Sequence, residues 1–155
     1  MYRDTLLKLF DYNVKVIAAN LEGITHQESL LQPQPGGNCP NWVLGHIVAN
    51  RNGIMALIGE DPVWSEEQAA PYRRGSAPLT DESTALPLDQ MLADLKASQD
   101  KLIAGLQRMP VEELEATLED GTRYEQLAFL QFHEAYHAGQ LGLLRRLGGK
   151  PGAIK

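Results

Sequence analysis

The sequence predicts an all-α protein, a four-helix bundle with a long crossover connection between helices two and three. Four long segments place apolar residues at the i, i+3, i+4 spacing of one helix face. No segment alternates regularly between apolar and polar residues, so strands are not expected. With 155 residues the chain can bury a core without a disulfide, and we expect one domain over residues 1–155.

The first predicted helix covers residues 4–22, and Gly23 follows it as a stop signal. Residues 24–37 contain two prolines and two consecutive glycines, which regular elements do not tolerate. We therefore expect a loop there, with His26 exposed to solvent.

The second predicted helix begins at Pro40, with Asn38 or Cys39 as its cap, and runs to about Gly59. Proline suits the first helical position because its missing N–H would have no partner there. Residues 60–87 contain four prolines among polar residues, so they form a long connection. We expect this connection to cross over the end of the bundle and to be a candidate for function.

The third predicted helix covers residues 88–108, and Pro110 ends it. Residues 111–121 are expected to add a short helical turn. The chain up to this point therefore supplies three of the four helices of the bundle.

The fourth predicted helix lies within residues 122–149 and carries two histidines four residues apart. Thr122 followed three residues later by Glu125 predicts a capping box, and two consecutive glycines mark the end. His133 and His137 share the spacing of leucines on one face, so both are expected to point into the bundle.

Three inward histidines predict a metal site. Side chains at i and i+4 of a helix are about 6 Å apart at Cβ, so the nitrogens of His133 and His137 can converge on one cation. His46, on an inward face of the second helix, can supply a third ligand and leave an open position, as in catalytic zinc sites. The alternative for each histidine is a hydrogen bond to a backbone carbonyl.

His133 and His137 are also the ends of the segment HEAYH. This segment matches the HExxH motif of zinc metalloproteases, in which the glutamate is the general base. Those enzymes take a further ligand from downstream, yet no His, Asp or Glu follows His137. A protease of this kind is therefore excluded. Glu134 is a candidate catalytic base or partner of a ligand histidine, and the alternative is an exposed side chain.

Other polar residues are candidates to support the site. Asn50, one turn after His46, and Gln140, three residues after His137, can orient imidazoles, or can form ordinary hydrogen bonds between helices. Cys39 is the single cysteine, so no intrachain disulfide can form. It is either inert packing or a reactive thiol near a helix start.

The composition excludes several partners. The formal net charge is −6, and the basic residues are scattered, so we expect no nucleic-acid partner. The N-terminal residues lack an apolar signal region, and no apolar run is long enough to span a bilayer. We expect a cytoplasmic protein with no membrane partner.

The segment HEAYHAGQLGLLRRLGGKPG is similar to the C-terminal signature of the DinB/YfiT-like superfamily, in which H-x-x-x-H-x-G-Q-L precedes an arginine and a Gly-rich end. NWVLGHIVAN resembles the second-helix segment of that family. The resemblance covers essentially the whole chain. It implies a bundle, often a homodimer, with a divalent metal such as nickel or zinc on His46, His133 and His137.

Characterised members of that superfamily include transferases and isomerases that use low-molecular-weight thiols such as bacillithiol or mycothiol. The resemblance therefore implies a metal-dependent thiol S-transferase, or a related transferase or isomerase, that acts on a small molecule. One alternative is a metal-dependent hydrolase with Glu134 as general base. Another is a non-catalytic dimeric bundle that binds ligands or acts in a stress response.

Overall fold

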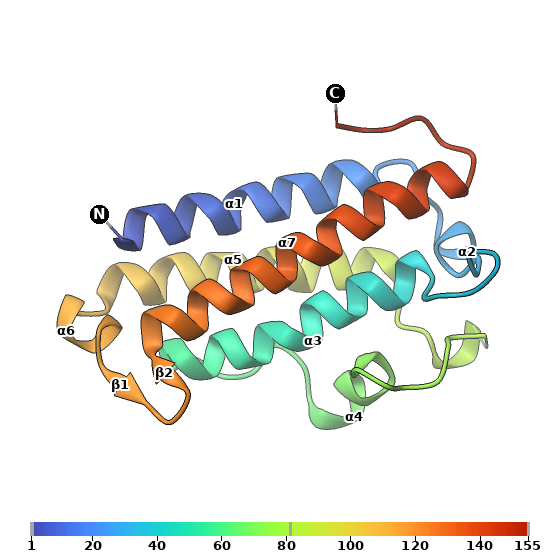
Figure 1. Ribbon diagram of the computed structural model, residues 1–155. Coiled ribbons are helices and arrows are strands. Elements are labelled where there is room, and N and C mark those ends of the chain that lie inside the picture. The colour runs from blue at the N-terminus through green and yellow to red at the C-terminus, as the bar shows by residue number, and fades with distance from the viewer. Residues whose placement is uncertain (1, 81, 155) are drawn as a thin grey trace.

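Four long helices form the bundle in the computed structural model, which describes residues 2–80 and 82–154 (Figure 1). α1 and α7 run in one direction, and α3 and α5 run in the other (Figure 1). Around the bundle each helix contacts two of the others, in the order α1, α7, α3 and α5. The prediction of an all-α fold is confirmed. The four helices are α1 (Tyr2–Leu21), α3 (Pro40–Ile58), α5 (Leu88–Arg108) and α7 (Arg123–Leu147).

Short elements connect these helices. The prediction that residues 24–37 lack regular structure is wrong at their start, because Thr25 and Glu28 form a capping box that begins the one-turn helix α2. His26 lies in this turn and is partly buried. A two-residue antiparallel hairpin also forms where no strand was expected. The short elements are α2 (His26–Ser29), α4 (Glu66–Ala69), the 3₁₀ turns Ala70–Tyr72 and Glu82–Thr84, α6 (Val111–Leu114), β1 (Thr117–Leu118) and β2 (Gly121–Thr122).

The predicted long crossover connection between α3 and α5 is present, but it does not pass over the end of the bundle (Figure 1). It returns along the outer side of α3, where α4 lies beside that helix (Figure 1). The route follows from the parallel arrangement of α3 and α5, since the chain must travel back the length of α3 before α5 begins. With α5, α7 and the connection around it, α3 is buried at every residue from Pro40 to Val48.

A polar layer crosses the middle of the bundle and separates two apolar clusters. One cluster surrounds residues such as Trp42 and Met91, and the other surrounds Phe10 and Leu102. Between them each long helix contributes at least one buried polar side chain. Among these residues are Asn13, Arg51, Gln99 and Glu134.

Gly45 allows the connection to pack closely on α3. A Cβ built at this position would lie 2.1 Å from Cδ1 of Tyr72, which is far shorter than a non-bonded contact between two carbon atoms. The Tyr72 side chain is fully buried, and its hydroxyl donates to Oδ1 of Asn41 and accepts from the backbone N–H of Leu86. The missing side chain at Gly45 therefore makes room for a ring that fixes the connection.

We predict that Gly45→Ala lowers the free energy of unfolding by about 1–3 kcal/mol, because the tyrosine ring must move out of a packed site. The matched control is Gly53→Ala in the same helix, where a Cβ would meet only Cδ1 of Leu130 at 3.7 Å. That substitution should be neutral or stabilise the protein by up to about 1 kcal/mol, since alanine favours helix. Chemical denaturation measures both free energies of unfolding. Equal changes in the two variants would contradict the close contact between Gly45 and the Tyr72 ring.

Candidate metal centre

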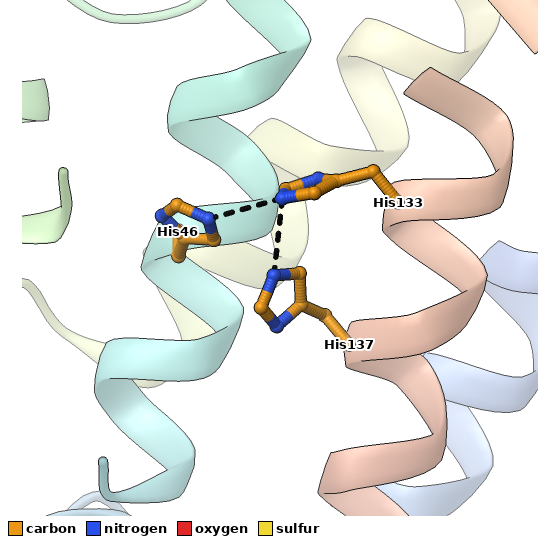
Figure 2. Close-up of side chains that lie close together, drawn as sticks. All are labelled: His46, His133 and His137. Carbon is orange, nitrogen blue, oxygen red and sulfur yellow. Dashed lines mark hydrogen bonds between the residues drawn. The ribbon is translucent and has the colours of Figure 1, made fainter. Parts of the chain in front are cut away.

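Three imidazoles converge between α3 and α7. Nε2 of His133 lies 3.3 Å from Nε2 of His46 and 3.1 Å from Nε2 of His137 (Figure 2). In the part of the chain that the structure describes, these three side chains form the one group of three or more potential ligands whose donor atoms all lie within 4.8 Å of one another. The structure therefore brings together the three histidines that the sequence singled out.

Hydrogen bonds at Nδ1 fix the tautomers of two of these rings. Nδ1 of His46 lies 2.6 Å from the carbonyl oxygen of Tyr72, which can only accept, so Nδ1 carries the proton. Nδ1 of His137 likewise donates to Oε1 of Gln140 at 2.7 Å. The Nε2 atoms of both rings are therefore left with a lone pair that points toward the third histidine.

Too few protons lie among the three Nε2 atoms to satisfy them. His133 can offer one proton from its own Nε2, and it cannot serve both neighbours with it. The amide of Asn50 lies 3.3 Å from Nε2 of His46, but its shorter bond, at 2.7 Å, goes to the carbonyl oxygen of the same residue. Tetrahedral zinc with Zn–N bonds of about 2.0–2.1 Å separates its ligand nitrogens by about 3.3–3.4 Å. The two separations from Nε2 of His133 are close to this value, and all three donor atoms lie within 4.8 Å of one another, so these donors could hold one cation.

The protein environment keeps the three imidazoles neutral. Burial lowers the pKa of His46, against a smaller upward effect from its hydrogen bond to the Tyr72 carbonyl. Burial, and then the nearby charge of His46, lowers the pKa of His133. Burial lowers the pKa of His137 to about 4, although its bond to Gln140 opposes the shift. Neutral imidazole is the form that binds metals, so near pH 7 no proton has to leave before a cation enters.

The site lies at the edge of the interior rather than inside it. Both histidines of α7 point toward His46 of α3, as expected, but His133 is only partly buried (Figure 2). α7 packs against α1 as well as α3, so the centre of its buried face lies near Glu134 and Leu141. The exposed rings of Phe129 and Tyr136 lie on the solvent side of the same histidines. Part of the His133 ring is therefore open to solvent beside these rings.

Glu134 lies neither against the histidines nor in solvent. Its side chain is buried in an ion pair in which Arg51 Nε donates to Oε2 at 2.6 Å and Nη2 donates to Oε1 at 2.9 Å. Nη1 of Arg51 donates to Oε1 of Gln99 at 2.9 Å. Both expected positions for this glutamate are therefore wrong, because one step along α7 turns its side chain about 100° from His133, toward the bundle axis.

The pairing of Arg51 with Glu134 was not predicted, although the sequence contains a sign of it. Arg51 is the one Lys, Arg, Asp or Glu residue of α3, and it lies among apolar residues of that helix. A buried arginine needs an anionic partner, and Glu134 is the acidic residue in the middle of the last helix. Cys39 is also fully buried, and burial raises the pKa of its thiol, so it is a packing residue rather than a reactive one.

The model of the DinB superfamily matches residues 10–141, a range that includes the three histidines. The chain belongs to the DinB superfamily. This superfamily includes metal-binding members. The bundle is similar in fold to a conserved protein of Enterococcus faecalis, at 20% sequence identity and a TM-score of 0.74, over 95% of this chain and 97% of that one. A comparison with curated proteins gives no match. No described helix of this DinB protein is long and apolar enough to span a membrane.

We predict that Glu134→Gln lowers the free energy of unfolding by about 3–5 kcal/mol, because it leaves the Arg51 charge buried without its partner. The double substitution Arg51→Leu with Glu134→Leu should cost less than the sum of the single ones. Glu66→Gln, which breaks the exposed pair with Arg73, is the control and should have little effect. Chemical denaturation measures the stability of each variant. Similar losses of stability for Glu134→Gln and Glu66→Gln would show that the buried ion pair contributes no more than the exposed one.

Proposed function

We propose that this protein is a metal-dependent enzyme of the thiol S-transferase kind, with His46, His133 and His137 as ligands of a zinc or nickel ion. The convergence of three neutral Nε2 atoms with too few protons among them is the observation that supports the metal. A divalent cation held there supplies Lewis acidity, which lowers the pKa of a small-molecule thiol. Membership of the DinB superfamily adds support for the metal, since some of its members bind metals.

The residues around the histidines support a reaction between two small molecules. Gln140 and the Tyr72 carbonyl hold two of the rings in orientation, and Asn50 lies beside His46. The protein's own thiol is buried and protonated, so the nucleophile has to come from a cosubstrate. A free Cys39 also suits a reducing compartment such as the cytoplasm, where small thiols remain reduced.

The hydrolase alternative has less support. A general base needs a carboxylate oxygen within hydrogen-bonding reach of the reacting water. Both oxygens of Glu134 accept from Arg51 instead, and neither belongs to the group of potential ligand atoms. The thiol mechanism requires no such base and is therefore the better fit.

Metal content tests the first part of the proposal. We expect tag-free protein to bind about one equivalent of zinc or nickel, measured by elemental analysis after dialysis, and His46→Ala and His137→Ala to bind less than about a tenth as much. His26→Ala removes the remaining histidine, which lies in α2 outside the group, and should bind metal as the wild type does. A folded wild type that cannot be loaded with any divalent metal would overturn the proposal.

Thiol binding tests the second part. In protein loaded with cobalt(II), 2-mercaptoethanol should change the visible spectrum and add a near-ultraviolet charge-transfer band, because sulfur replaces an oxygen donor. Ethylene glycol, which has the same shape with a hydroxyl in place of the thiol, should leave the spectrum unchanged. An unchanged cobalt spectrum at saturating thiol would contradict the thiol mechanism while leaving the metal site intact.

We also propose that the protein is a homodimer. Five large apolar side chains of α7 are exposed, and their spacing places them in one stripe along the helix. A stripe of this length is typical of an interface with a partner. It consists of Phe129, Phe132, Tyr136, Leu143 and Leu147, exposed by 57–65%.

Sedimentation equilibrium tests this proposal. Leu143→Glu should raise the dissociation constant of the dimer by about ten-fold or more, because it places a charge in the stripe. Leu31→Glu is the control, since Leu31 is equally exposed at 60% but lies outside α7. A wild-type protein that sediments as a monomer at high concentration would rule out the dimer.

A further inference from the structure

A cavity of about 330 Å³ lies between α3, α7 and the connection that follows α3. His46 forms part of its wall, so a molecule in this cavity lies beside one of the three candidate ligands. The volume is at the lower end of the range for small-molecule sites. We call it the arginine cavity, and the residues that matter in it are His46, Asn50, Asn52, Arg73, Arg74 and Leu130.

The charge of the arginine cavity is opposite to that of the whole chain. The sequence has 20 acidic and 14 basic residues, with a net charge of −6. Two arginines line the cavity, and no acidic side chain occurs among the described residues of its wall. A cavity with these charges attracts an anion and disfavours a cation.

Arg74 is the group in this cavity that is free to bind a ligand. Arg73 pairs with Glu66 at the surface, and the amide of Asn52 is occupied by the backbone of Val63 and Trp64. Arg74 is exposed, and no hydrogen bond or ion pair joins its side chain to another residue that the structure describes. An unpaired guanidinium can hold a carboxylate, phosphate or sulfonate group through two parallel hydrogen bonds.

The backbone around Arg74 is held in place from both sides. On one side Tyr72 packs its ring on Gly45, and its carbonyl oxygen accepts from Nδ1 of His46. On the other side the hydroxyl of Ser76 accepts from Nε1 of Trp42 and donates to the carbonyl oxygen of Pro71. The segment that orients His46 therefore also holds the backbone on both sides of Arg74, and both side chains line the same cavity.

We propose that Arg74 binds an anionic group of the small molecule that reacts at the three histidines, so that the substrate or its thiol cosubstrate carries a carboxylate, phosphate or sulfonate. This rests on the proposed function for the identity of the reacting centre. The apolar wall near Leu130 contacts the body of the molecule, and the guanidinium sets its orientation. The result is selection for anionic over neutral substrates of the same size.

The test compares matched ligands by isothermal titration calorimetry on the zinc-loaded protein. The probes are 3-mercaptopropionate and 6-mercaptohexanoate, their neutral analogues 2-mercaptoethanol and 6-mercaptohexanol, and succinate, which has no thiol. The wild type should bind at least one of the mercapto acids about ten-fold more tightly than its neutral analogue. Arg74→Gln should abolish this difference without changing the affinity for the neutral thiols.

Two further variants complete the test. Arg74→Lys should retain part of the preference, because the charge remains but the bidentate geometry is lost. Arg146→Gln makes the same charge change at an exposed arginine in the last turn of α7 and should change nothing. Equal affinity for acids and alcohols in the wild type, or an Arg74→Gln protein that keeps the preference, would overturn the inference.

Succinate separates this inference from the proposed function. If succinate binds, loses affinity in Arg74→Gln, and no thiol binds, the anion site stands and the thiol mechanism fails. If thiols bind with no preference for the acids, the mechanism stands and the anion site fails. A protein that binds none of the probes contradicts both.

Discussion

The ion pair between Arg51 and Glu134 sets the register of the two helices that build the site. A bidentate guanidinium–carboxylate contact tolerates little sliding, and both groups are buried where an unpaired charge is costly. His46 precedes Arg51 on α3, and His133 and His137 lie on either side of Glu134 on α7. Pairing the two charges therefore places the three imidazoles at one level of the bundle.

The connection after α3 adds the second constraint. Because α3 and α5 run in parallel, the chain has to return along α3, and Gly45 lets the ring of Tyr72 pack there. The Tyr72 carbonyl then selects the tautomer of His46, which aims its Nε2 lone pair at His133. A loop that the topology requires thus becomes part of the site, and it brings two arginines to the wall of the neighbouring cavity.

The sequence was sufficient to predict the four long helices and the pairing of His133 with His137, because helical periodicity and i, i+4 spacing are local properties. The place of His46 beside them was predicted from its inward face on the second helix and from the family resemblance. The direction of Glu134 was not predictable in the same way. It lies one residue from His133, and whether that side of α7 is buried depends on how α1 and α3 both pack against it. The path of the connection along α3 likewise follows from the directions of the helices, which the pattern of residues does not contain. The capping box that begins α2 was present in the sequence and was overlooked among prolines and glycines.

The central claim is that Nε2 atoms of His46, His133 and His137 bind one divalent cation. A crystal of the zinc-loaded protein, measured at the zinc absorption edge, tests it most directly. The anomalous difference map should show one strong peak about 2.0–2.1 Å from all three Nε2 atoms. A zinc peak bound by other residues, or three histidines with no peak between them in zinc-saturated crystals, would contradict the account.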